Sequence, residues 1–421
     1  MSTIELHDYR ACDKALREAD LKQALYDEGA LLMDRVLVTL HGEEHRERRL
    51  LEMRVFRRDF FRHYENEVIP QIFKSVITPF IERGSADVVD FGYRVMVYLA
   101  ITFAGIDRQD GSEAEFDDLV RLLRTFGLAA TLGQSKVDRE SGKAEIRSAL
   151  EEFDQRFFTP SAARRQRLIE RFRAGEVDED QLPMDILTVL LRNEDGLDLA
   201  RDMVLRETGF FFLAGAHTSV HSLGHAVHHL LTWCEEHPED RARLLQDSTL
   251  VQRFVHESFR LHPSSPVAWR KALAEVAFDD GTVARTGDKV VINLRLANRD
   301  AEVFGDDADV FNPYRTPVKG VPETGITFGI GIHSCLGKNL AAGILPLPGQ
   351  AVEADKRQLG MVTWMARGLL AAGAVRDPER SGRLDATIDR ETWQTYPILF
   401  APELSPQQGA RATENQESAD G

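Results

Sequence analysis

Apolar side chains recur at spacings of three and four over much of the chain, which is the pattern of amphipathic helices. The segments with this pattern are residues 63–83, 88–104, 114–127, 141–173, 184–192 and 199–232. Residues 275–294 instead alternate apolar and polar side chains around two turns that contain Gly281 and Gly287, and this alternation predicts a small hairpin sheet. We therefore expect a mainly α protein with small β-sheets.

These elements follow one another without an internal repeat or a linker, so the simplest organisation is a single domain over residues 4–403. Residues 404–421 are polar and lack periodicity, and we expect a disordered tail there. Glycines and prolines break the helical pattern between residues 343 and 357, which predicts an inserted surface loop before a further helix over residues 359–372.

The overall charge disfavours some classes of partner. Lys and Arg total 52 against 68 Asp and Glu, a formal net charge of -16, so the average field repels nucleic acid and anionic membrane surfaces. The N-terminus lacks a signal-like apolar core, and no run of about 18 apolar residues occurs. We expect a soluble, cytoplasmic protein that binds neither nucleic acid nor a membrane.

The three cysteines, Cys12, Cys234 and Cys335, are odd in number and far apart, which argues against a disulfide framework. Cys335 lies in TFGIGIHSCLGKNLA, residues 327–341, where glycines let the backbone turn and approach a flat ligand closely. Peptide N–H groups at the start of the following helix can bond a thiolate and lower its pKa. The loop therefore indicates a thiolate ligand for iron, with a buried structural cysteine as the alternative.

This loop resembles the haem loop of the cytochrome P450 family. The residues that match its fixed positions are Phe328, Gly329, Gly331, His333, Cys335 and Gly337. The resemblance implies the P450 fold and a bacterial-type haem-thiolate enzyme that holds haem b, iron protoporphyrin IX, with Cys335 as the axial ligand of the metal. In that family further helix and strand usually precede the segment equivalent to residues 7–18, so the resemblance leaves either a reduced N-terminal sheet region or a fragment.

Other landmarks of the family follow in the expected order. Glu257 and Arg260 can pair on one helix face and resemble the Glu-x-x-Arg signature, whose third partner would be Arg315. A cofactor that carries carboxylates in a protein interior needs charge-assisted donors. By family position, these donors are His45, Arg49, Arg270 and His333; a solvated surface is the alternative for each of them.

The segment FFFLAGAHTSVHS resembles the family's distal helix, in which Ala214 and Gly215 would leave room for the cofactor and dioxygen. The resemblance implies that Thr218 is catalytic and helps to deliver protons. His217 stands where most members have Asp or Glu, and an imidazole can relay protons near neutral pH; packing against a neighbouring helix is the alternative. His217 also begins a stripe with His221, His225, His228 and His229, which predicts either polar helix packing or a zinc site.

The leading hypothesis is a monooxygenase that inserts one oxygen atom of O2 into a hydrophobic small molecule, by hydroxylation or oxidative dealkylation. Electrons would come from a separate ferredoxin and reductase, because the chain has no G-x-G-x-x-G fingerprint. One alternative is a peroxide-using peroxygenase, which Thr218 disfavours. The other is a non-catalytic haem-binding sensor, in which His217 in place of the usual carboxylate would account for the loss of oxygen activation.

The resemblance also assigns a pocket and a docking face. The expected pocket residues are apolar, which favours a hydrophobic substrate: Phe210, Leu213, Ala214, Val267, Ala268 and part of the segment 25–40. The expected docking face for an acidic ferredoxin is basic: Arg46, Arg54, Arg57, Arg58 and Lys338.

Overall fold

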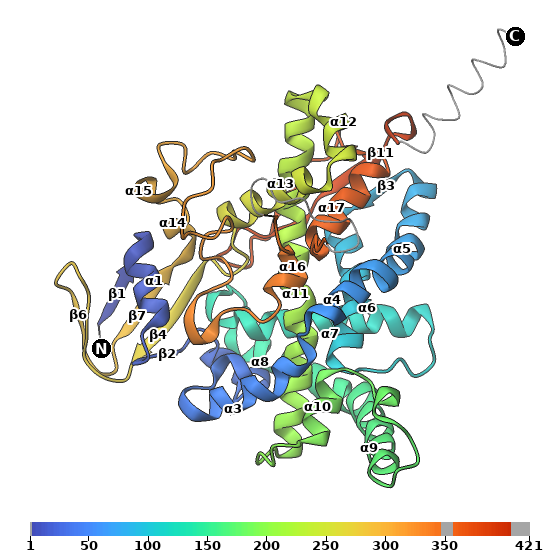
Figure 1. Cartoon of the computed structure of the whole chain (residues 1–421), viewed down its shortest axis with the longest axis vertical. Coiled ribbons are helices and arrows are strands. Elements are labelled where there is room, and N and C mark those ends of the chain that lie inside the picture. Colours follow the sequence, from blue (N-terminus) through green and yellow to red (C-terminus); the bar gives the residue numbers. More distant parts are fainter. Residues whose placement is uncertain (1, 347–356, 406–421) are drawn as a thin grey trace, which may run out of the picture.

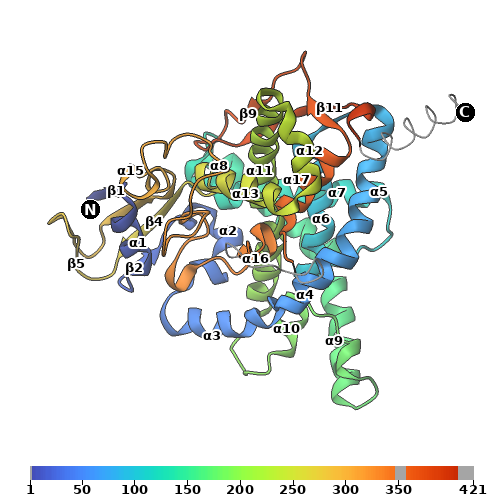
Figure 2. The same ribbon diagram turned by 45° about the horizontal axis from the view of Figure 1, so that its top comes forward.

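The computed structural model describes residues 2–346 and 357–405. One long helix, α11 (Arg201–Glu236), runs through the middle of a helical body, and a β-rich region that contains the N-terminus lies to one side (Figures 1 and 2). No helix among residues 2–346 and 357–405 combines the length and the apolar character needed to cross a membrane.

The predicted helices are present with nearly the predicted bounds. Helices α6 (Val88–Ala104), α7 (Glu113–Thr131) and α10 (Ile186–Arg192) are single elements. The predicted helices 63–83 and 141–173 are each divided by a π turn. Their parts are α4 (Arg58–His63) and α5 (Ile69–Arg83), and α8 (Arg139–Phe153) and α9 (Thr159–Arg173). A proline, Pro70 or Pro160, directly follows each division, where its missing N–H cannot continue the α-helical ladder.

The remaining helices are shorter on average and surround α11 or the sheets. They are α1 (Tyr9–Arg17), α2 (Ala30–Met33), α3 (Gly42–Glu52), α12 (Pro238–Gln246), α13 (Ser248–Leu261), α14 (Leu294–Ala297), α15 (Ala301–Phe304), α16 (Lys338–Ala342) and α17 (Met361–Ala371). Helix α17 confirms the helix predicted over residues 359–372.

The strands form small sheets, as predicted. A four-stranded sheet has the order β1 (Thr3–Leu6), β7 (Lys289–Asn293), β4 (Val267–Ala272) and β2 (Leu21–Gln23). A three-stranded sheet has the order β3 (Ser85–Asp87), β11 (Pro397–Phe400) and β8 (Ala374–Arg376). Two further pairs are β5 (Val276–Ala277) with β6 (Val283–Ala284), and β9 (Arg383–Leu384) with β10 (Trp393–Thr395).

The hairpin predicted over residues 275–294 is only partly correct. Strands β5 and β6 pair across the Gly281 turn, but β7 leaves the hairpin and pairs with β4 and, in parallel, with β1. The first residues of the chain thus supply a strand and, through α1, part of the core of this sheet. A pairing partner so distant in sequence cannot be read from local alternation.

The helical body and the four-stranded sheet each have a hydrophobic core. The larger core gathers around α11 and α6 and includes Phe91, Phe126 and Phe212. The smaller core lies between α1 and the four-stranded sheet and contains Cys12, which is fully buried. The division into one domain over residues 4–403 stays a prediction.

Residues 343–357, the predicted inserted loop, begin and end side by side. Ile344 forms a β-bridge with Gln358, and a Cβ atom at Gly360 would lie 2.3 Å from the backbone nitrogen of Gly343. Gln252, on α13, donates to the carbonyl groups of Ala342 and Gln358 at 2.9 and 3.1 Å. Residues 347–356 of the loop, and the predicted tail from residue 406 onward, lie outside the described residues.

Candidate functional site

A cavity of about 300 Å³ lies between α11, α3, α6, β4 and the loop that carries Cys335. With one exception, His217, the residues that the sequence predicted to bind a cofactor or to act in catalysis line this cavity. They are His45, Arg49, Ala214, Gly215, Thr218, Arg270, Phe328, Gly329, His333, Cys335 and Gly337. These residues come from four separate parts of the chain: α3, α11, β4 and the Cys335 loop.

The Cys335 loop is held by its own backbone. The N–H group of Cys335 donates to the carbonyl oxygen of Phe328 at 2.8 Å, and Gly329 has a φ of +64°, which an L side chain rarely adopts. Gly331 also has a positive φ, but it faces α1, because a Cβ atom there would lie 2.8 Å from the carbonyl oxygen of Leu16. Gly331 therefore permits close packing against α1, and not the approach to a flat ligand that the sequence suggested.

The thiol of Cys335 is exposed to the cavity. Burial among protein atoms raises its pKa, although the N–H groups of Gly337 and Lys338 and the charges of Arg49 and Lys338 oppose this shift. The N–H groups at the helix start therefore act on the pKa of the thiol in the expected direction, although desolvation outweighs them.

Four nitrogen-bearing side chains meet at one side of the cavity. The rings of His45, on α3, and His333, in the loop, have centroids 4.5 Å apart. In both rings Nε2 is buried and has no hydrogen-bond partner among the described residues. Arg49 donates to the carbonyl oxygen of Ser334 at 2.6 Å, and Arg270 donates to Oε1 of Gln23 at 2.9 Å. Within the described chain neither guanidinium contacts a carboxylate, so this side of the cavity suits an anionic group.

Helix α11 forms another part of the cavity wall. Ala214 and Gly215 present little side chain, and the hydroxyl group of Thr218 is exposed to the cavity, where its internal bond to the carbonyl oxygen of Ala214 is long, at 3.4 Å. The predicted apolar residues Phe210, Val267 and Ala268 also line the cavity. Leu213 does not: it is buried in the helical core.

A family model described as Cytochrome P450 matches residues 163–346, which include α11, α13 and the Cys335 loop. Pulcherriminic acid synthase of Bacillus subtilis (strain 168) is 27% identical over 315 residues, which cover 73% of this chain and 70% of that enzyme. The chain belongs to the cytochrome P450 superfamily. It is an oxygenase of that superfamily, and its cofactor is haem.

Two further similarities agree with this P450 assignment. Vitamin D(3) 25-hydroxylase of Pseudonocardia autotrophica is 32% identical over 174 residues, 41% of this chain and 40% of that enzyme. The crystal structure of CalO2 superimposes with a TM-score of 0.70 and 20% identity, and the match covers 94% of this chain and 90% of CalO2. The fold is therefore the P450 fold over almost the whole chain.

The residues of this P450 fit a haem group. Haem carries two propionate groups, and the unpaired nitrogens of His45 and His333, with the guanidinium groups of Arg49 and Arg270, are matching donors. Burial lowers the pKa of His45 to about 4 and that of His333 to about 3, and of Arg270 to about 10. The two imidazoles are therefore neutral near pH 7, and the two guanidinium groups carry the positive charge.

His217 is the exception among the predicted site residues. Its Nδ1 lies 2.9 Å from the hydroxyl group of Tyr93, on α6, and its Nε2 lies 3.1 Å from Nε2 of His221. A Cβ atom at Gly127, on α7, would lie 2.5 Å from the ring, so the imidazole fills the space between α6, α7 and α11. Burial, with the charges of Arg390 and Arg124, lowers its pKa to about 3. These contacts favour the packing alternative over the predicted relay.

The histidine stripe of α11 continues this packing. His225 Nε2 lies 2.5 Å from the carbonyl oxygen of Glu391, and His228 Nδ1 lies 3.0 Å from the hydroxyl group of Tyr396. The stripe therefore joins α11 to the C-terminal strands, in agreement with polar helix packing.

Two buried ion clusters hold the elements that carry the site. Arg260 bonds both oxygens of Glu257, at 2.8 and 2.7 Å, and Arg315 bonds Glu257 at 3.3 Å, which confirms the predicted three-residue cluster. The second cluster was missed: Arg48, on α3, pairs with Glu52 and with Glu207, on α11. It fixes the helix of His45 and Arg49 against α11. The sequence signal was weak, because an Arg–Glu pair at i, i+4 is usually solvated.

Proposed function

We propose that this P450 is a monooxygenase that inserts one oxygen atom of O2 into a hydrophobic small molecule, with Cys335 as the axial thiolate. The observation that supports this most strongly is that Cys335, from its loop, and Thr218, from α11, line one cavity whose remaining lining is largely apolar. When bound, haem supplies the activation of dioxygen.

The chain's own residues would then have separate tasks. His45, Arg49, Arg270 and His333 would hold the propionates and so fix the orientation of the macrocycle. Thr218 would hold a proton on its hydroxyl group at the cavity surface, where its internal bond is weak enough to be exchanged. Phe210, Val267 and Ala268 would exclude water and bind the apolar substrate.

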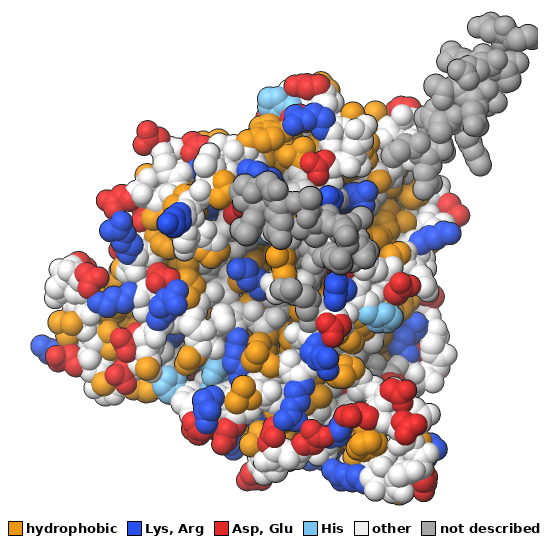
Figure 3. Space-filling model, viewed as in Figure 1, with side chains coloured by type: hydrophobic (Ala, Val, Ile, Leu, Met, Phe, Trp, Pro, Cys, Tyr) orange, Lys and Arg blue, Asp and Glu red, His pale blue; other side chains and the backbone are white. Residues whose placement is uncertain are grey.

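Electrons would come from a separate ferredoxin, but the structure changes the expected docking face. Arg46 pairs with Glu43, Arg57 lies 3.4 Å from Asp59, and Arg54 bonds Glu194 and Asp195 at 3.1 and 2.9 Å. On the face drawn in Figure 3, basic and acidic side chains are accordingly intermixed.

Two basic residues on the Cys335 side are better candidates for docking. Arg10, on α1, and Lys338, on α16, line a surface pocket of about 700 Å³ that also reaches Cys335. Neither has an ion-pair partner within residues 2–346 and 357–405. We therefore place the docking of an acidic ferredoxin over this pocket.

Replacement of Cys335 by Ala tests the proposed function. The reduced protein under carbon monoxide should show the red-shifted Soret band of a thiolate-bound haem, and Cys335→Ala should lose it. Cys234→Ala, at a buried cysteine of α11 outside the cavity, is the matched control and should keep the band. An unchanged spectrum in Cys335→Ala would refute the assignment of this ligand.

A further inference from the structure

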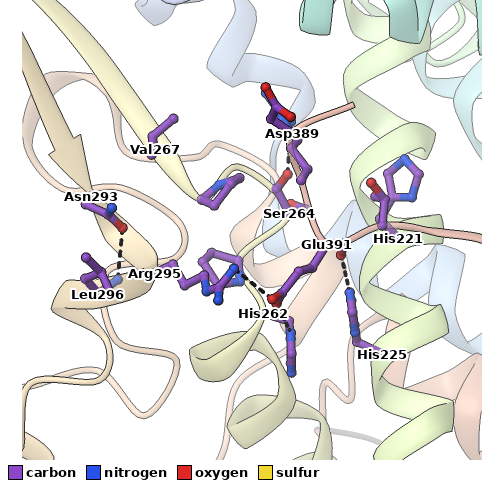
Figure 4. A pocket seen from close by; sticks show the side chains of 14 residues that line it. His221, His225, His262, Ser264, Val267, Asn293, Arg295, Leu296, Asp389 and Glu391 are labelled. Atoms are coloured by element: carbon purple, nitrogen blue, oxygen red, sulfur yellow. Dashed lines mark hydrogen bonds and ion pairs between the residues drawn. The ribbon is translucent and has the colours of Figure 1, made fainter. Parts of the chain in front are cut away.

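A second pocket, of about 320 Å³, lies beside the cavity, and Ser264 and Val267 line both. Figure 4 shows its walls: His221 and His225 of α11 on one side, Asn293 and Leu296 on the other, and Asp389 and Glu391 from the C-terminal segment between them. The shared residues make the two spaces neighbours, so a ligand in one can extend toward the other.

The charges around this second pocket do not balance. Glu391 pairs with Arg295 at 2.8 Å and with His262 at 3.2 Å, and Asp389 pairs with Lys136 at 3.4 Å. Arg390 has no carboxylate partner in the described part of the chain. Its Nε donates to Oε1 of Gln134 at 2.6 Å and its Nη1 to the carbonyl oxygen of Ser264 at 3.0 Å. Both acceptors are neutral, so one positive charge at the pocket remains uncompensated.

The position of Arg390 is fixed by the backbone on both sides of it. Lys136 donates its N–H to the carbonyl oxygen of Thr387 at 2.8 Å, and Asp389 donates to the carbonyl oxygen of Gln134 at 3.1 Å. On the other side, the carbonyl oxygen of Glu391 is held by His225. The guanidinium group is therefore set in place before any ligand binds, which lowers the entropic cost of binding.

The guanidinium group also lies close to the wall of the haem cavity. Its charge contributes to the lowered pKa of His217 and His221. Burial lowers the pKa of Arg390, and Tyr26, a residue that lines the cavity, opposes this shift. His221 adds a further polar atom, because its Nδ1 is buried without a partner among the described residues.

A cation with only neutral partners in a partly buried site is costly unless an anion joins it. No described hydrogen bond uses Nη2 of Arg390. The end of a guanidinium group, with its two Nη atoms, matches the two oxygens of a carboxylate.

We propose that Arg390 binds the carboxylate of an acidic hydrophobic substrate whose apolar body extends past Ser264 and Val267 into the part of the cavity that Thr218 lines. This inference rests on the proposed function and narrows its substrate class from hydrophobic molecules to hydrophobic carboxylic acids.

Binding of matched acids and amides to the haem-loaded protein tests this inference. The probes are octanoic, dodecanoic and 4-phenylbutanoic acids with their primary amides, and dissociation constants are measured by calorimetry and by the shift of the Soret band. At least one acid should bind about tenfold or more tightly than its amide, as expected for a charge-assisted pair. Arg390→Gln should abolish that preference, and Arg390→Lys should restore part of it.

The ratio of the two constants within one variant does not depend on how much protein is folded, so lost stability cannot imitate the result. Arg383→Gln, which removes a positive charge from an exposed position in β9, should keep the preference. Equal binding of every acid and its amide by the wild type, or an acid preference that survives in Arg390→Gln, would overturn the inference. A normal carbon monoxide spectrum in the same samples would leave the proposed function standing.

Discussion

The hydroxyl group of Tyr93, on α6, lies 2.9 Å from Nδ1 of His217, on α11. Successive residues of a helix point about 100° apart, so His217 packs against α6 and α7 while its neighbour Thr218 faces the cavity. The residue that stands in place of the usual carboxylate is thus part of the helix interface, and the two neighbours should respond differently to substitution.

For His217, we expect His217→Ala to lower the free energy of unfolding by about 1–3 kcal/mol, because it leaves a cavity and an unpaired Tyr93 hydroxyl group. Product formed per NAD(P)H consumed should stay at the wild-type level in the folded protein. Thermal unfolding and coupling measurements check this. Normal stability with poor coupling, recovered in His217→Asp, would instead support a proton relay.

For Thr218, we expect Thr218→Ala to keep haem and substrate binding but to divert electrons to hydrogen peroxide. The reason is that the substitution removes a cavity-lining hydroxyl group that is exposed, whereas Ser219 and Ser222 of the same helix are buried. Thr218→Ser retains a hydroxyl group and should keep most of the coupling. Coupling in Thr218→Ala equal to that of the wild type would exclude the proposed role, and efficient turnover with peroxide alone would favour a peroxygenase.

For the propionate donors, we expect Arg49→Gln and Arg270→Gln each to speed haem loss about tenfold, since each removes one charge-assisted bond. Transfer of haem to an excess of apomyoglobin measures the rate. Arg46→Gln is the control, because Arg46 lies on α3 like Arg49 but is exposed and already pairs with Glu43. If haem leaves Arg49→Gln and Arg270→Gln no faster than it leaves Arg46→Gln, these two arginines do not hold the cofactor.

For the electron donor, we expect Arg10→Glu to slow reduction by an acidic ferredoxin severalfold at low salt, with the difference fading as salt is added. Reduction by dithionite should not change. Arg54→Glu is the comparison, because Glu194 and Asp195 already neutralise Arg54. A larger effect at Arg54 than at Arg10 would return the docking face to the segment after α3.

For the buried cluster on α3, stability should depend on pH. Two carboxyl groups share Arg48, and burial raises the pKa of Glu207 to about 7 and that of Glu52 well above 4.5. The folded state therefore binds more protons than the unfolded state above pH 4.5, so the stability contributed by these groups falls as pH rises toward the raised values.

Glu52→Gln removes one of these carboxyl groups. Above pH 4.5 it should gain stability relative to the wild type as the pH rises toward the raised pKa of Glu52, by up to about 1.4 kcal/mol for each pH unit. Chemical unfolding at several pH values measures this difference. Glu44→Gln, at an exposed position of α3 paired with Arg35, should show no such trend. A constant difference across the pH range would show that Glu52 is ionised in both states.

The sequence alone determined the helical class of the protein, the helix bounds around α6, α7 and α11, and most of the site. These features depend on local signals: the periodic burial of apolar side chains and the short loop around Cys335. The family resemblance also pointed to Thr218, His45, Arg49, Arg270 and His333, and the tertiary structure brings these residues from four parts of the chain to one cavity.

Only the tertiary structure decided the direction of His217, the neutralised arginines near α3, the Arg48–Glu207 pair and the isolated charge of Arg390. Each depends on which distant side chain lies within a few ångströms: Tyr93 for His217, Asp195 for Arg54, and no carboxylate of the described chain for Arg390. Helix periodicity fixes where a side chain lies on its own helix but not what faces it. Charge balance and burial are therefore decided by tertiary packing.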